Sequence, residues 1–341
     1  MATTSTVPVI PPRTAIGDYR VLERFASGGM GDLYRVVNPL LREVFAMKVL
    51  RDDTGAGHRT ESVQRFFEEA RTTVRLRHGN IVTLHTMGLE PISGHLYFIM
   101  DYVGLNAQRR AQILGDGPWF AAPTTEASEE TREPMSLEDL LAFRGPIPEE
   151  ILRILAADIA AALNHAHQAG VVHCDLKPDN LMVDADGTVK VMDLGISRSV
   201  LTAAKEGAAD NASEIMGTPA YMSPDQIYDL PDLDCRADIY SLGATLYQLL
   251  TGHVLFPGKT DQQVVDAHIG PNFARDPRVL MPAIPRPLAL MLNRMLAKDR
   301  TLRYPNWETL AADIAHLYAG EPLLATPLKP GESSVSFTAE W

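Results

Sequence analysis

The sequence has little cysteine, no long hydrophobic run and fewer basic than acidic residues. Its 341 residues include only Cys174 and Cys235, which excludes a disulfide framework or cysteine-rich zinc site and favours the reducing cytoplasm. No stretch reaches the roughly 18 uninterrupted apolar residues of a membrane span. The first residues also lack the basic start and apolar run of a signal peptide. A net charge of −12 argues against nucleic acid and anionic membranes as partners.

The composition is that of a globular protein. Hydrophobic residues make up 45% of the chain and charged residues 22%, which is enough to bury a core without disulfides or metal. The length predicts about two domains.

The first part of the chain has the pattern of a small sheet with one helix. Residues 1–16, rich in Thr, Val and Pro, predict a flexible arm. Residues 17–103 form the strand-rich first unit, in which 19–50 alternate and turn like a series of strands. The segments predicted there are a strand at 44–50, a helix at 61–77, and strands at 81–84 and 95–103.

The rest of the chain is mostly helical. Residues 104–134 contain three prolines and an acidic run and show little periodicity, so they predict a long insertion that acts as a lid or docking site or has no fixed structure. Residues 135–319 follow as a helical part, and 320–341 as a loose tail. Helices are predicted at 149–168, 236–251, 260–268, 286–298 and 306–318, with one hairpin at 181–183 and 189–192.

A glycine-rich segment and a lysine are the first candidates for phosphate binding. Gly28, Gly29 and Gly31 lie between two predicted strands, where glycine lets backbone N–H groups approach an anion. An ordinary glycine turn is the alternative. Lys48 shares a strand face with apolar residues and needs an anionic partner if buried. Its alternative is an edge lysine that reaches water.

A glutamate on the predicted helix is the next candidate. Glu68 lies on the charged face of 61–77, whereas Glu69 neighbours Phe66 and Thr73 beside the apolar stripe. The helical spacing therefore predicts that Glu69 points towards the core. The alternative is an ordinary carboxylate at the edge of the apolar face.

Two short segments carry the most specific chemistry. In the segment 172–180 (VHCDLKPDN), Asp175, Lys177 and Asn180 lie in one proline-containing loop. An aspartate can accept a hydroxyl proton, a lysine can neutralise a phosphoryl group, and an asparagine can ligate a hard cation. Asp193, followed by Leu194 and Gly195 at a strand end, suits Mg²⁺ held between protein and phosphates.

In order and spacing these motifs resemble those of a Ser/Thr protein kinase. The residues within them are most similar to the eukaryotic-like kinases of bacteria. Further motifs in the family's order are 217–225 (GTPAYMSPD), 238–243 (DIYSLG) and Arg303. The resemblance covers about residues 17–318. It implies an α+β, two-lobed kinase-like fold, with a small antiparallel-sheet N-lobe with one main helix and a larger, mostly helical C-lobe.

The resemblance also implies a role for each site residue. Asp175 would accept the substrate hydroxyl proton, Lys177 would stabilise the transferring phosphoryl group, and Lys48 would bind phosphates while pairing with Glu69. Asn180 and Asp193 would hold Mg²⁺, with Mn²⁺ as an alternative. The ATP-binding residues would be Gly28, Gly29, Gly31, Leu33, Ala46, Lys48, the gatekeeper Met100, the hinge residues Asp101 and Val103, Asn180 and Asp193. The partner would be a protein with a Ser or Thr acceptor.

Structural roles follow from the same resemblance. Asp238 would anchor the catalytic loop, and Asp225 and Arg303 would form an ion pair. Other proteins would dock, if anywhere, on the 104–134 insertion or the tails.

Several residues depart from the family pattern. Ala26 replaces the first loop glycine, Leu194 the phenylalanine after the metal-binding aspartate, and Asp225 a glutamate. Cys174 stands where many kinases have an arginine that pairs with a phosphate on the activation loop. A thiol cannot do so, and we therefore expect weak dependence on loop phosphorylation.

Three other functions compete with a protein kinase. A nucleotide-binding scaffold without efficient catalysis is favoured only by Ala26, Cys174 and Leu194. A small-molecule kinase is disfavoured by the 217–225 segment, which the family uses as a platform for protein substrates. A nicotinamide-binding loop is excluded because a strand pattern, residues 32–37, follows the glycines instead of a helix.

Overall fold

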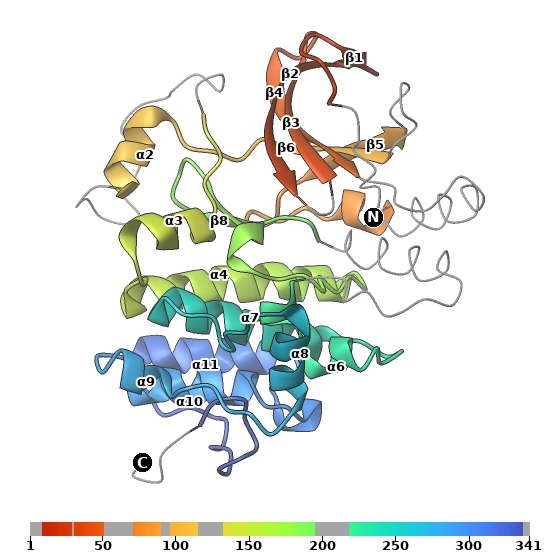
Figure 1. Ribbon diagram of the computed structural model, residues 1–341. Coiled ribbons are helices and arrows are strands. Elements are labelled where there is room, and N and C mark those ends of the chain that lie inside the picture. Colours follow the sequence, from red (N-terminus) through yellow and green to blue (C-terminus); the bar gives the residue numbers. More distant parts are fainter. Residues whose placement is uncertain are drawn as a thin grey trace.

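The computed structural model describes residues 9–28, 31–50, 71–89, 96–114, 132–194 and 218–336. It has a twisted antiparallel sheet at one end and a larger helical part at the other (Figure 1). A strand-rich first part and a helical second part are thus confirmed.

The sheet has six strands in the order β1-β2-β3-β4-β6-β5, and every pairing is antiparallel. Their bounds are β1 (Ala15–Ile16), β2 (Tyr19–Gly28), β3 (Gly31–Asn38), β4 (Glu43–Leu50), β5 (Leu84–Leu89) and β6 (Leu96–Asp101). β4 is central and buried from Val44 onwards, as expected of an apolar strand covered on both faces. The strand predicted at 44–50 is therefore confirmed.

The prediction of a strand at 81–84 is wrong in its bounds. Only Leu84 belongs to β5, whereas Ile81 forms an isolated parallel bridge with Val191 of the helical part. Ile81 is buried because the segment joins the two parts, not because it continues the sheet. Of the helix predicted at 61–77, only 71–77 lie within the described residues, and 71–75 are helical.

The helical part surrounds one buried helix. Its elements are α2 (Ala107–Leu114), α3 (Leu137–Arg144), α4 (Glu149–Gln168), η2 (Pro178–Asn180), β7 (Leu181–Val183), β8 (Val189–Val191), η3 (Pro219–Tyr221), α6 (Pro224–Ile227), α7 (Cys235–Thr251), α8 (Asp261–Ile269), α9 (Pro277–Leu280), α10 (Arg286–Met295), η4 (Arg300–Leu302) and α11 (Trp307–Ala319). In α7 every residue but Arg236 is buried, so helices pack on all its sides. The five predicted helices and the hairpin are confirmed to within three residues at each end.

The two chain ends are more ordered than composition suggests. In the predicted arm, Ile10 is buried and its N–H donates to the Tyr34 hydroxyl. In the predicted tail, Ser333, Ser334 and Val335 are buried. The expectation of a loose segment is thus wrong for 332–336, because backbone pairing, which composition does not reveal, holds the segment to the loops around Ala274 and Leu296.

None of the helices within the described residues is both long and apolar enough to cross a lipid bilayer.

The buried imidazole of His268 on α8 makes stability depend on pH. Burial lowers the pKa of His268 to about 4, and the charge of Lys298 acts in the same direction. A histidine in an unfolded chain has a pKa of about 6.5, so between these pH values the unfolded chain binds more protons. Stability present above pH 6.5 is therefore lost as the pH falls towards 4, by at most about 1.4 kcal/mol per pH unit.

We expect the free energy of unfolding of His268→Gln to fall less steeply than that of the wild type between pH 6.5 and pH 4. Urea titrations at several pH values measure both curves, and the carboxylates common to both proteins cancel in the difference. Parallel curves would show that His268 is not held neutral by burial.

Candidate active site

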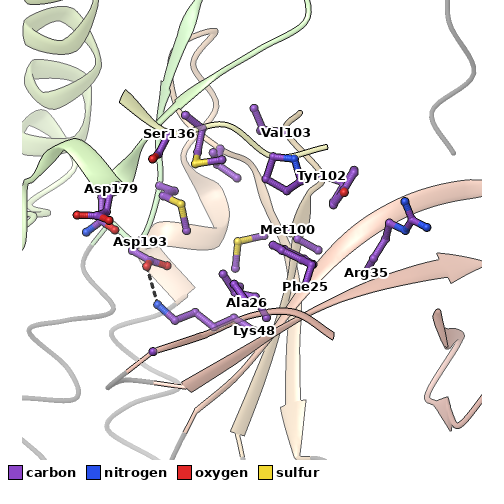
Figure 2. A pocket seen from close by; sticks show the side chains of 18 of the residues that line it. Phe25, Ala26, Arg35, Lys48, Met100, Tyr102, Val103, Ser136, Asp179 and Asp193 are labelled. Carbon is purple, nitrogen blue, oxygen red and sulfur yellow. Dashed lines mark hydrogen bonds and ion pairs between the residues drawn. The ribbon is translucent and has the colours of Figure 1, made fainter. Parts of the chain in front are cut away.

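A cavity of about 1300 Å³ lies between the sheet and the helical part. Figure 2 shows Lys48 and Ala26 on its sheet side facing Asp179 and Asp193 on the other. The predicted site residues that line it are Gly28, Gly31, Leu33, Ala46, Lys48, Met100, Asp101, Val103, Asp175, Lys177, Asn180 and Asp193. Gly29 and Glu69 lie outside the described residues, so the expected Lys48–Glu69 pair has no structural description.

Of the glycine segment, Gly28 ends β2 and Gly31 begins β3. A Cβ atom built on Gly31 would lie only 2.2 Å from the carbonyl oxygen of Val49 on β4, so packing against the backbone requires glycine there. Gly28 has no such neighbour, since its nearest atom would be 4.0 Å away. Open space at Gly28 is what a backbone that approaches a ligand needs.

A hydrogen bond between side chains joins the end of β2 to the start of β3. The Ser27 hydroxyl donates to the buried Asp32 carboxylate over 2.6 Å. Ser27 and Asp32 on either side of the glycines are therefore held together, even with Ala26 in place of the usual glycine.

Lys48 and Asp193 join the two walls of the cavity. The Lys48 ammonium lies 2.5 Å from Oδ2 of Asp193, and each side chain is only 8% exposed (Figure 2). Asp193 has a φ of 62°, a left-handed conformation that non-glycine residues seldom adopt. Its other oxygen, Oδ1, is buried and accepts no hydrogen bond from the described residues.

Asp175 and Lys177 form a compact polar cluster with Thr218. The Lys177 ammonium lies 2.9 Å from Asp175 Oδ2 and donates to the Thr218 hydroxyl over 2.6 Å. That hydroxyl in turn donates to Asp175 Oδ1 over 3.3 Å. The Asn180 amide donates to the Asp175 carbonyl and carboxylate, at 2.7 and 3.2 Å. The carboxylate is thus held at a fixed place on the cavity wall.

The loop that carries Asp175 is fixed from behind by Asp238 of α7. The two oxygens of this buried carboxylate accept the backbone N–H groups of His173 and Cys174, at 2.8 and 2.9 Å. Burial raises the pKa of Asp238, and the two N–H donors oppose that shift. Gln226 donates to the carbonyl of Cys174 over 2.6 Å. Cys174 is held between them with a left-handed φ of 65°.

The segment 100–103 forms the back and one side of the cavity. Met100 is buried at the end of β6, and Val103 is buried just beyond it. The Asp101 N–H is bound to the carbonyl of Thr83, and its carboxylate accepts from His85 and from the Thr83 N–H. The Asp101 side chain therefore ties the segment to Thr83 and His85 and fixes its place along the cavity.

Sequence reasoning missed several lining residues. Met182 and Met192, from the hairpin, lie on the helical wall, and Tyr102 and Arg35 lie at the mouth. The alternation of the hairpin gives a signal for Met182, because it separates two buried neighbours, Leu181 and Val183. Arg35 has no comparable signal, since it reads as an ordinary exposed strand residue.

The predicted insertion contributes to the mouth of the cavity. Its ends pair through Leu105 and Glu133. A Cβ atom on Gly104 would approach the Glu133 carbonyl to 2.7 Å, so this close pairing needs glycine. Ile113 of α2 is fully buried in the core of the helical part. The described part of the insertion therefore has fixed structure, and its base lines the cavity at Arg110, Arg132, Glu133 and Pro134.

The expected ion pair between Asp225 and Arg303 is present, with 2.6 Å between its atoms. Arg303 is fully buried and also donates to the carbonyls of Ala297, Lys298 and Arg236. The pair ties α6 to the segment around η4 and lies outside the cavity lining.

Comparison with known proteins places these features in one family. Residues 125–314, more than half of the chain, match the model of the protein kinase domain. The kinase domain of Mycobacterium tuberculosis PknI has the same fold, with a TM-score of 0.63, 24% identity, and coverage of 92% of this chain and all of that one. The predicted two-lobed kinase-like fold is thus confirmed.

Curated relatives agree. The chain is 32% identical over 313 residues to the DNA damage-responsive serine/threonine-protein kinase RqkA of Deinococcus radiodurans, covering 92% of this chain and 41% of that protein. It is 29% identical to the serine/threonine-protein kinase PrkC of Bacillus subtilis (90% and 41%) and 30% identical to PknB of Mycobacterium leprae (93% and 45%). The chain therefore spans about two fifths of the length of these relatives.

Removing one acceptor from Asp238 tests its hold on the loop. In Asp238→Asn one of the two backbone N–H groups faces an amide NH₂ and loses its partner, which costs about 2–3 kcal/mol of stability. Urea denaturation measures it. The exposed Asp261→Asn on α8 is the matched control and should change stability by less than about 0.5 kcal/mol. If both variants lost equally little stability, the two hydrogen bonds from the loop to Asp238 would not be what stabilises it.

Proposed function

The chain belongs to the protein kinase family, and from this membership we propose that it transfers the γ-phosphoryl group of Mg-ATP to a serine or threonine hydroxyl of a protein. The observation that carries the proposal is the arrangement of Lys48, Asp193 and Asp175 around one cavity. The curated relatives are named serine/threonine kinases, which supports the acceptor class.

Each wall of the cavity has its own task in this proposal. Gly28 and Gly31 cover the phosphates, Leu33 and Ala46 enclose the base from the sheet side, and Lys48 binds the α- and β-phosphates. Met100, Asp101 and Val103 hold the base through their backbone and the buried Met100 side chain. We assign Gly29 to the phosphate cover and Glu69 to Lys48 on the family pattern alone.

The oxygens on the helical wall fit a hard cation. Asp193 Oδ1 is buried with no hydrogen-bond donor within the described residues, and Asn180 brings an amide group to the same cavity. No group of three or more His, Cys, Asp or Glu side chains suited to a metal occurs in the described part of the chain. That agrees with Mg²⁺, or Mn²⁺, bound by one or two side chains and completed by phosphates and water. When bound, the ion would neutralise charge on the phosphates.

The reaction needs the acceptor hydroxyl in line with the γ-phosphorus. Asp175 accepts the hydroxyl proton as the new O–P bond forms and the bond to ADP breaks. Lys177 lies against Asp175 and faces the oxygens of the transferring group, so it offsets their charge. Thr218 holds Asp175 and Lys177 together. Positioning and electrostatics thus supply the catalysis.

We also propose that activity depends weakly on phosphorylation of the activation loop. The position of Cys174 is buried, 4% exposed, and its backbone is fixed by Asp238 and Gln226 without an arginine. The loop conformation that an arginine–phosphate pair stabilises in other kinases is therefore supported from within the helical part. The segment that would carry the phosphate lies outside the described residues.

The division into an N-lobe with the hinge at 17–103 and a C-lobe at 135–319, and docking of partners on the 104–134 insertion or the tails, stay predictions. So does a location in the cytoplasm, for which two buried thiols outside any disulfide are the support.

One prediction of this proposal concerns Asp193. In Asp193→Asn the carboxylate charge next to Lys48 is lost, and phosphoryl transfer should fall by about 100-fold or more. Purified protein incubated with Mg²⁺ and ATP, with phosphosites mapped by mass spectrometry, measures it. The matched control is Asp186→Asn, at the exposed tip of the same hairpin, which should retain full activity.

Phosphate on serine or threonine in the wild type and the control alone would support the kinase. ATP binding without transfer to itself or to basic protein substrates would instead favour the nucleotide-binding scaffold, which Ala26, Cys174 and Leu194 suggest.

Another prediction of this proposal concerns phosphorylation of the activation loop. Replacing Ser197, Ser199, Thr202 and Ser213 together with alanine should leave most of the activity, within about threefold, because no arginine precedes Asp175 to read a phosphate. Initial rates with a generic protein substrate measure it. Loss of activity in the quadruple variant would refute the proposal that activity depends only weakly on phosphorylation of the activation loop.

A further inference from the structure

The segment 332–336, at the far end of the helical part, is built into the core beside α7 and α8. It follows α11, and Figure 1 shows the chain after that helix running along the face farthest from the sheet. Ser334 is fully buried, with its N–H bound to the carbonyl of Leu296 and its carbonyl accepting from the Ala274 N–H, at 2.8 and 2.7 Å. The family model ends earlier, at residue 314.

A chain of polar contacts leads inward from this segment. The Ser334 hydroxyl lies 2.9 Å from the hydroxyl of Tyr240 on α7, and that hydroxyl lies 2.8 Å from Nδ1 of His268 on α8. All three side chains are fully buried. Burial keeps the imidazole neutral at pH 7, so one of its ring nitrogens donates and the other accepts.

Helix α8, which carries His268, packs against η3, the segment that follows Thr218. The backbone of Pro219 and Ala220 lies close to the imidazole, whose Nε2 has no hydrogen-bond partner among the described residues. Apolar contacts follow the same route, since Val335 and Tyr221 belong to one buried cluster together with Tyr240. Thr218 precedes η3 and bonds to both Lys177 and Asp175.

We propose that Ser334, held in the core by its segment 332–336, positions the 218–221 segment against Asp175 and Lys177 through Tyr240 and His268, so that these three are positioning residues. This inference rests on the proposed function for its kinetic consequence. It assigns the segment a part in placing the acceptor hydroxyl and none in holding ATP, because 332–336 is not among the residues that line the cavity.

The adjacent serine provides a matched control. Ser333 is as buried as Ser334, but its hydroxyl donates to the carbonyls of Asn293 and Leu296 on and beside α10, away from Tyr240. Ser334→Ala and Ser333→Ala each remove one buried hydroxyl from neighbouring positions, so a general loss of stability affects both alike.

The kinetic test compares these variants in the full chain. In Ser334→Ala, kcat/KM for a protein substrate should fall by about fivefold or more, with the KM for ATP unchanged. In Ser333→Ala both values should stay within about twofold. Tyr240→Phe should match Ser334→Ala, and the double variant should be no worse than either, because both break the same chain of contacts. Additive losses, or equal losses in both serine variants, would overturn the proposal.

Hydrogen exchange tests the same proposal without activity. The N–H groups of Tyr221 and Met222 are bound to the carbonyls of Thr218 and Pro219, at 3.1 and 3.3 Å. Their exchange should be about fivefold faster in Ser334→Ala than in Ser333→Ala. Equal exchange would overturn the positioning role. If the wild type transfers no phosphate while the difference in exchange is found, the proposed function fails and the structural coupling stands.

Discussion

The site depends on one buried carboxylate, that of Asp238 at the start of α7. A charge in this place is costly, and the two backbone N–H groups of the loop 173–174 offset that cost. The N-terminal turn of a helix also favours a negative charge. Because the loop supplies the donors, the carboxylate and the loop conformation stabilise each other, and Asp175 takes its place at the cavity wall as a consequence.

The same helix organises the rest of the helical part. From one buried cylinder, Thr245 contacts the carbonyl of Leu176, Gln248 binds Tyr221 and Glu138, and Tyr240 binds His268 and Ser334. Each of these polar groups is satisfied by a different segment of chain. A helix that is apolar except for such groups specifies where its neighbours lie as well as that they are buried.

The sequence was sufficient for regular elements and for the motif residues, for identifiable physical reasons. The helix at 149–168 is fixed by Pro148 and a clear apolar period, and its predicted bounds are those of α4. Lys48, Asp175 and Asp193 could be assigned to one site only through the family resemblance, because 145 residues separate Lys48 from Asp193 and no local pattern links them.

What the sequence missed depends on contacts between distant segments. The tail reads as loose by composition, yet the buried Asp313 accepts the N–H groups of Leu324 and Ala325, and Ser334 reaches Tyr240. The helix α3 went unpredicted because its capping box, Ser136 with Asp139, follows a proline-rich stretch without an apolar period.

Three methionines, Met100, Met182 and Met192, contribute to the lining of the cavity. Thioether side chains are flexible and polarizable, so this lining can adapt to flat ring systems of different outline. Met182 and Met192 are partly exposed, unlike the buried Met100, so their sulfur atoms are the more open to oxidation, and a sulfoxide there would place a polar group in the cavity lining. An oxidant that leaves the fold intact would therefore close the cavity to its ligand, and reduction of the sulfoxides would reopen it.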